Sequence, residues 1–165
     1  MKKVLLILFV LAICVLAFPQ GVLAATFPSN DVVISANYGT TTTFNAAKGV
    51  FPVPWNLAAG YDNEVKDGIV FTLTTQAPTW RVTAESDNGG FMHGNQGNLL
   101  SPFLVHSTFN SQYLAPTGGM VVKEGSSNYN NQNWNEYIRQ PVALNDMGSG
   151  NGWTITIVFT CDAGF

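Results

Sequence analysis

The chain has 165 residues and a formal net charge of −3 at pH 7, and only 10% of its residues are charged. Average soluble domains carry about 25% charged residues, so uncharged polar residues fill most surface positions here. The few basic residues are scattered along the chain, which excludes nucleic-acid binding because that function needs a basic patch. A surface with few charges opposes self-association only weakly. The composition therefore suits proteins that pack together or bind neutral sugars outside the cell, and also any extracellular protein with a neutral surface.

Residues 1–24 have the three parts of a secretory signal peptide. Lys2 and Lys3 precede an apolar stretch that is shorter than the roughly 20 residues of a membrane-spanning helix. The small-residue pattern at the end of this segment predicts cleavage after Ala24, with Ala25 as the alternative site. We therefore expect a secreted protein at the cell surface or in the extracellular space, with no membrane contact after cleavage. A retained membrane anchor is the other interpretation of this segment.

Cleavage would remove Cys14 and leave Cys161 as the single cysteine of the mature chain. A single cysteine cannot form an internal disulfide, so Cys161 is either a buried apolar side chain or a link between chains. Its position in an apolar strand pattern favours burial.

After residue 25 the apolar residues recur with a period of two in short runs bounded by Gly, Pro, Asn and Asp, a pattern typical of β-strands. The clearest runs are 69–74, 80–85 and 153–160, and weaker ones are 32–36, 41–44, 50–57, 103–107, 120–123 and 138–143. Pro52 and Pro54 make the run 50–57 an edge strand or an extended arm. About eight or nine short strands predict an all-β fold, a two-layer antiparallel β-sandwich of jelly-roll or immunoglobulin-like type.

Four tryptophans lie beyond the predicted signal peptide. Trp80 and Trp153 are in phase with the apolar faces of their strands and are predicted core residues. Residues 126–135 are rich in Asn and predict a surface loop. Exposed aromatic rings beside amide side chains are typical of sugar-binding faces, so this segment is a predicted glycan contact made by Trp134, Tyr129, Asn133 and Asn135. The other interpretation is that Trp134 closes the edge of the sandwich.

The sequence contains little that points to catalysis. The two histidines, His93 and His106, do not form a metal-binding motif, and no nucleophile-elbow motif is present. We therefore expect a protein that is not an enzyme and has no obligatory cofactor. One acidic cluster could bind calcium through hard oxygen ligands, or could be a solvated turn: Asp62, Asn63, Glu64 and Asp67.

Two tryptophan motifs resemble those of WxL-type cell-surface domains. They are Trp80-Arg81-Val82 and Trp153-Thr154-Ile155, with Leu99-Leu100 and Pro102-Phe103-Leu104 between them. The resemblance covers roughly residues 69 to 160, and valine and isoleucine stand where that family prefers leucine. It implies a β-rich domain held non-covalently on a cell envelope.

The order of segments is also similar, in layout, to biofilm fibre subunits of the TasA and camelysin kind. That resemblance implies self-assembly into extracellular filaments of a biofilm matrix, with an N-terminal donor strand that completes the sheet of a neighbouring copy. The expected donor segment is 25–45, with Val32, Val33, Ile34 and Phe44 as its apolar residues, ahead of a sandwich domain over 46–165. An ordinary first strand is the other interpretation of this segment. The expected partners are other copies of the chain or, alternatively, cell-envelope polysaccharide bound by a carbohydrate-binding module.

Overall fold

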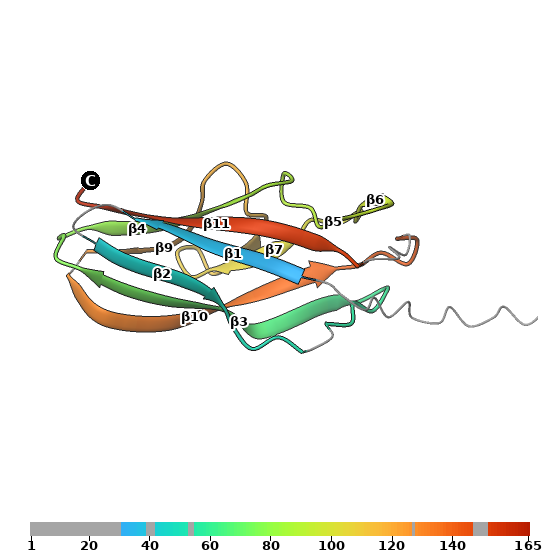
Figure 1. Cartoon of the computed structure of the whole chain (residues 1–165), viewed down its shortest axis with the longest axis horizontal. Coiled ribbons are helices and arrows are strands. Elements are labelled where there is room, and N and C mark those ends of the chain that lie inside the picture. The colour runs from blue at the N-terminus through green and yellow to red at the C-terminus, as the bar shows by residue number, and fades with distance from the viewer. Residues whose placement is uncertain (1–30, 39–41, 53–54, 127, 147–151) are drawn as a thin grey trace, which may run out of the picture.

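A computed structural model describes residues 31–38, 42–52, 55–126, 128–146 and 152–165. The described residues form two β-sheets with no α-helix (Figure 1), which confirms the prediction of an all-β fold and is consistent with a β-sandwich. They contain no helix long and apolar enough to cross a membrane. The predicted signal peptide lies outside the described residues.

The first sheet has six strands. β11 pairs with β4, which pairs with β9, while the short β5–β6 hairpin joins the beginning of β11 and β1 adds to β11 as well. The strands are β1 (Asp31–Tyr38), β4 (Trp80–Ser86), β5 (His93–Gly94), β6 (Gly97–Asn98), β9 (Met120–Gly125) and β11 (Thr154–Ala163). Every pair is antiparallel except β1 with β11, which is parallel.

The second sheet has five antiparallel strands in the order β2-β3-β10-β7-β8. They are β2 (Thr42–Lys48), β3 (Asp62–Thr75), β7 (Leu104–Ser107), β8 (Gln112–Leu114) and β10 (Tyr129–Pro141). The long β3 and β10 form the centre of this sheet, and β2 and β8 are its edges.

The alternation predicted from the sequence places one face of the main strands in the core. In β11 the buried side chains are Ile155, Ile157, Phe159 and Cys161, and the residues between them are half-buried. Successive side chains of a strand point to opposite faces of its sheet, so a period of two produces one apolar face. Phe71 of β3 meets Phe159 of β11 with ring centroids 4.9 Å apart, which joins the two layers.

The predicted core tryptophans Trp80 and Trp153 are each 1% exposed, and that prediction is confirmed. The described residues between β2 and β3 form no strand, and two of them, Trp55 and Leu57, are buried against the core. Prolines lack the backbone donor that a sheet strand needs, which explains why the described residues of this apolar segment form no strand.

The prediction of a surface loop over 126–135 is wrong for residues 129–135, which belong to β10. This strand pairs with β3 through positions such as Trp134 with Phe71 and Gln132 with Leu73. Asparagine is uncommon in strands, so the sequence of this segment argued against a strand. Pairing with the strongly β-forming β3 overrides that local preference.

The predicted donor segment contributes to both layers. β1 joins the first sheet and β2 joins the second, so residues 42–48 pair with β3 inside the sandwich. The expected boundary between residues 45 and 46 therefore falls within β2.

Candidate functional site

β1 occupies the edge of the first sheet and runs parallel to β11. Eight consecutive residues keep one register, from Asp31 opposite Thr154 to Tyr38 opposite Cys161. Among the described strands, β1 pairs with no other strand. Among the described strands, β1 is therefore an outer strand of this sheet, next to β11.

The predicted donor residues take different positions. Val32 is buried, being only 2% exposed, whereas Val33 is 47% exposed and Ile34 is half-buried against the core. Phe44 lies on β2 and stacks on Phe71 with centroids 5.7 Å apart. Of the described β1 side chains, Val32 is therefore the buried one, while Phe44 of β2 is an integral core residue.

The two sides of the sandwich have different edges. On one side, β1 and β2 are seven or eight residues long and keep a continuous register with their neighbours. On the other side, β8 has only three residues, and β9 has a register shift opposite Val82 and Thr83 and carries Lys123 and Glu124. Short strands, bulges and charges are the devices that block edge-to-edge pairing. The β8/β9 side has these devices, and the β1/β2 side is regular.

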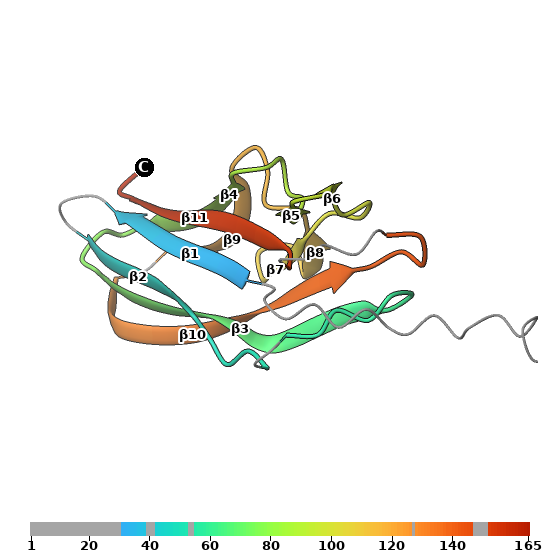
Figure 2. The same ribbon diagram turned by 45° about the vertical axis from the view of Figure 1, so that its right-hand side comes forward.

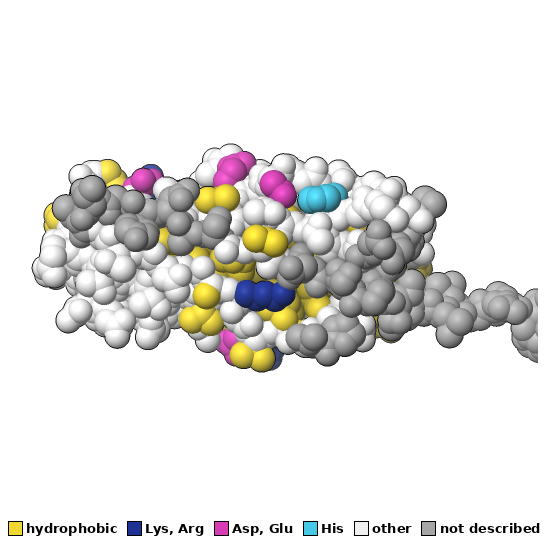
Figure 3. Space-filling view, in the orientation of Figure 1, with side chains coloured by type: hydrophobic (Ala, Val, Ile, Leu, Met, Phe, Trp, Pro, Cys, Tyr) yellow, Lys and Arg dark blue, Asp and Glu magenta, His cyan; other side chains and the backbone are white. Residues whose placement is uncertain are grey.

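The surface over β1 and β2 is mostly uncharged. Figure 3 shows hydrophobic side chains and one basic group in the middle of this face, with acidic groups towards its upper and lower rims. The basic residue of β2, Lys48, lies over the ring of Phe51, 4.9 Å from its centroid. Because Lys48 lies at one end of β2, charge repulsion would oppose pairing with another strand only weakly over most of this side.

The predicted glycan residue Trp134 packs inward. Its indole lies between Phe71 and Trp80, with centroid distances of 5.1 and 6.0 Å, and Lys123 Nζ lies 4.8 Å from its centroid on β9. Its Nε1 is buried without a hydrogen-bond partner among the described residues. The indole faces are therefore occupied by side chains of the protein.

The amides beside Trp134 point to the opposite face of β10. Asn133 Oδ1 accepts a hydrogen bond from the Thr72 hydroxyl at 2.7 Å, and Asn135 Nδ2 donates to Asp67 Oδ1 at 3.0 Å. Neighbouring residues of a strand cannot share a face, so the structure does not bring the indole and these amides together. The side chain of Tyr129 lies outside the described residues.

The predicted calcium ligands are engaged with other protein groups. Arg139 binds Glu64 at 2.9 Å, and this hydrogen bond lowers the pKa of Glu64. Arg139 also lies 3.5 Å from Asp62. Asn63 accepts from the Ala58 amide and donates to three backbone carbonyls. Among the described residues no group of three His, Cys, Asp or Glu side chains is placed to hold a metal ion.

Sequence reasoning missed a buried carboxylate on β10. Glu136 is 1% exposed, and its Oε2 lies 3.1 Å from His106 Nδ1. Burial raises the pKa of Glu136, while His106, Thr108 and Lys123 oppose that shift. The sequence offered one signal, because Glu136 continues the inward phase of Ile138 and Gln140.

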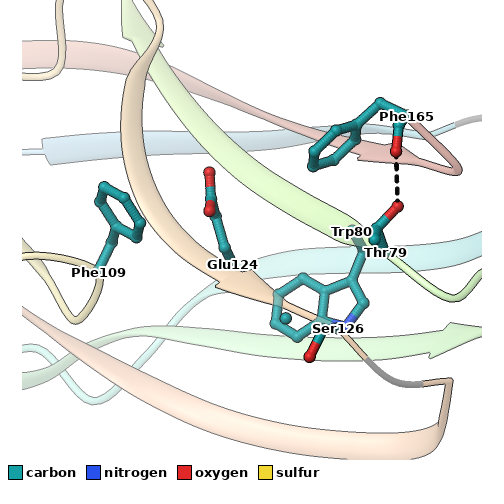
Figure 4. Close-up of a pocket in the computed structure, with 7 residues that line it drawn as sticks. Thr79, Trp80, Phe109, Glu124, Ser126 and Phe165 are labelled. Carbon is teal, nitrogen blue, oxygen red and sulfur yellow. Dashed lines mark hydrogen bonds between the residues drawn. The ribbon is translucent and has the colours of Figure 1, made fainter.

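A groove of about 380 Å³ lies where β4 begins and β9 ends. Figure 4 shows Phe109 and Phe165 on two sides of it, with Glu124 and the Trp80 indole between them. Phe109 and Phe165 are 56% and 62% exposed. Thr79 Oγ1 donates a hydrogen bond to the Phe165 carbonyl at 3.0 Å, which fixes the C-terminal residue at this end. The groove thus combines two exposed rings with a few polar groups.

No protein-family model matches the chain, and no curated protein matches its sequence. The resemblances to WxL-type domains and to biofilm fibre subunits therefore rest on the residues and layout described above.

Proposed function

We propose that the chain is a secreted, non-enzymatic structural protein that assembles with other copies by β-strand addition, with β1 as the donor strand. The observation that carries this proposal is the position of β1, which is added in parallel to β11 as an outer strand of the first sheet and keeps one register over eight residues. An identical β1 from another copy can occupy the same position with the same backbone hydrogen bonds, which makes exchange between copies low in cost.

The side chains of β1 fit this role. Val32 enters the core opposite Ile155, so it provides the apolar anchor and fixes the register. Val33 points outward and is not needed for docking. Backbone hydrogen bonds would give the affinity of the exchanged strand, and Val32 would give its specificity.

The two sides of the sandwich differ in how readily they could pair with a strand of another copy, which indicates the side at which copies join. The bulge and charges of β9 and the shortness of β8 oppose pairing there. The regular β1/β2 side, with few charges, accepts a strand. Exchange of a terminal strand around successive copies produces an open chain, which suits an extracellular filament or surface layer.

Carbohydrate or envelope binding has less geometric support as the main function. The predicted platform is divided between two faces of β10, with the Trp134 indole inside and Asn133 and Asn135 outside. No second function is proposed.

The test compares two neighbouring substitutions in the mature full-length protein. Val32→Asp places a carboxylate at the buried anchor and should abolish filaments in negative-stain electron microscopy, because β1 can no longer dock on β11 of any copy. Val33→Asp adds the same charge at the exposed neighbouring position and should leave filaments present. Tryptophan fluorescence should show that both variants keep the folded sandwich.

Two results would contradict the proposal. One is a wild-type protein that stays dispersed at high concentration, and the other is a Val32→Asp variant that still forms filaments. Equal loss of filaments in both variants would also contradict it, since charge alone would then explain the effect.

A further inference from the structure

The hairpin formed by β7 and β8 is attached to the second sheet by few backbone pairs. The register of β7 with β10 covers two positions, Val105 with Ile138 and Leu104 with Arg139. β8 lies outermost in this sheet, next to β7 (Figure 2), and pairs with no other described strand. The register of β10 with β3, by contrast, extends from one end of β10 to the other. Elements with few such pairs open locally at a lower free energy than the core does.

Side chains on the outer face of the second sheet also hold the hairpin. The Tyr113 hydroxyl on β8 donates a hydrogen bond to Glu64 Oε2 on β3 at 2.8 Å. Arg139 of β10 donates to the same oxygen at 2.9 Å, and its guanidinium lies 3.9 Å from the centroid of the Tyr113 ring. We call Glu64, Tyr113 and Arg139 the tyrosine cluster, which connects β8 to β3 and β10.

A buried carboxyl group makes a second side-chain link between β7 and β10. His106 Nδ1 lies 3.1 Å from Glu136 Oε2. The side chain of His106 is 26% exposed, whereas that of Glu136 is 1% exposed. The imidazole can therefore exchange protons with solvent, while the carboxyl group is shielded from water.

Other titratable groups face this pair from three strands. Lys123 of β9, in the opposite sheet, attracts the ionised form of Glu136. The His106 ring lies against Tyr113 of β8 and Tyr137 of β10, with centroid distances of 5.3 and 5.9 Å. Burial outweighs the attraction of Lys123 and His106, because the pKa of Glu136 is raised overall.

The net charge of the pair depends on one proton. With this proton the pair is neutral, either as imidazolium with carboxylate or as imidazole with carboxyl group. Without it, a negative charge remains on the carboxyl group of Glu136, which is 1% exposed. A charge removed from water is destabilising unless a partner neutralises it. The closed hairpin therefore binds this proton more tightly than an open hairpin, in which water reaches both groups.

We propose that the His106–Glu136 pair is a pH-sensitive switch that controls local opening of the β7–β8 hairpin. The hairpin stays closed while the pair holds its proton, and it opens more often as the pH rises and the proton is released. Opening would uncover the edge of β10 that β7 pairs with. The switch is independent of strand exchange, because it uses residues of neither β1 nor β11.

The tyrosine cluster does not change its charge in the same pH range. Hydrogen bonds from Arg139 and Tyr113 lower the pKa of Glu64. Burial and the hydrogen bond to Glu64 raise the pKa of Tyr113 to about 12. Glu64 therefore stays ionised and Tyr113 stays protonated from about pH 6 to about pH 9. A change in hairpin opening within this range is accordingly assigned to His106 and Glu136.

Amide hydrogen exchange of the mature full-length protein, measured by mass spectrometry, tests this switch. Rates in peptides covering residues 104–114 are corrected for the pH dependence of chemical exchange. A difference of one pKa unit between the closed and open states shifts the opening equilibrium about tenfold. We expect the wild-type protection of 104–114 to fall at least about tenfold from about pH 6 to about pH 9, while β3 and β11 keep theirs. Glu136→Gln should remove most of this fall, since an amide stays neutral.

Tyr113→Phe is the structural control. It removes the hydrogen bond to Glu64, so protection of the hairpin should be lower at every pH while its pH dependence remains. Wild-type protection that does not change with pH would overturn the switch, and so would an equal loss in β3 and β11, which indicates global unfolding. These two outcomes need no variant. A Glu136→Gln protein that retains the full wild-type pH dependence would also overturn it, because another group then titrates.

Discussion

The indole of Trp134 lies against the ring of Phe71, with centroids 5.1 Å apart and planes inclined by 28°. The same indole approaches Trp80, whose strand belongs to the other sheet. Trp134 therefore contacts side chains of both sheets, although the Asn-rich segment that carries it also suggested a glycan contact.

Truncation of this side chain should destabilise the fold. We expect Trp134→Ala to lower the free energy of unfolding by about 3 kcal/mol, because it removes the ring contacts with Phe71 and Trp80 and leaves a cavity. Urea denaturation checks this value, with Asn130→Ala at an exposed position of β10 as the control, expected within about 0.5 kcal/mol of wild type. Equal, small effects of both substitutions would mean that Trp134 does not support the core.

The buried carboxyl of Glu136 predicts a pH-dependent stability. Its folded-state pKa is raised by burial, so its contribution to stability is fully present below the unfolded pKa and is lost as the pH rises through the folded pKa. Glu136→Gln should therefore be more stable than wild type near neutral pH, and the difference should shrink in acid. Thermal unfolding at several pH values measures this difference.

Glu64 is a control of opposite sign. Arg139 and Tyr113 lower its pKa through hydrogen bonds, so its contribution is present above the unfolded pKa and is lost as the pH falls through the folded pKa. Glu64→Gln should be less stable than wild type at neutral pH and equal to it in strong acid. Parallel pH profiles for the two variants would refute the assignment of Glu136 as a carboxyl held at raised pKa.

The thiol of Cys161 should be inert in the folded protein. It is 1% exposed, and burial raises its pKa from 9.0 to about 11, which reduces the thiolate fraction near pH 8 roughly 100-fold. A colorimetric thiol reagent should react with it only after guanidinium unfolding. Rapid labelling of the native protein would instead favour an exposed thiol available for links between chains.

A side chain at Gly125 should disturb the floor of the groove. A Cβ there would lie 2.3 Å from Cε2 of the Trp80 indole, which is too close without a shift of one of them. We expect Gly125→Ala to cost about 1–3 kcal/mol of stability in urea denaturation. Ser126→Ala, at the exposed neighbouring position, is the matched control and should be nearly neutral.

Calcium should not stabilise the protein through the acidic cluster at the start of β3. Arg139 already bridges Asp62 and Glu64, and Asn63 is used by backbone groups. Millimolar calcium or a chelator should therefore change the Tm by less than about 1 °C in differential scanning fluorimetry. An increase of several degrees would indicate a bound ion and would support the calcium site predicted from the sequence.

Much of the fold could be predicted from local pattern. The strands around Phe71, Val82 and Ile157 coincide with the runs of alternating apolar and β-branched residues. Alternation with a period of two puts the apolar side chains on one face of a strand, and that face is buried. The failure at residues 129–135 has an equally physical cause. Pairing with β3 supplies the backbone hydrogen bonds of that segment, and long-range pairing is invisible to local propensity.

The candidate sites depended on the tertiary structure to a greater degree. Trp134 is next to Asn133 and Asn135 in the sequence, but neighbouring side chains of a strand point to opposite faces. The indole therefore lies on the inner face of β10 and the two amides lie on its outer face. His106 and Glu136 are 30 residues apart and meet only because β7 and β10 are neighbours.

The sequence by itself determined the all-β class, the inward faces of the main strands and the apolar character of β1, because these follow from periodicity and composition. Only the tertiary structure decided that β1 lies parallel to β11 at a regular edge and that β2 enters the other sheet. Strand order and the positions of sheet edges arise from contacts between residues distant in the chain, and no local pattern encodes them.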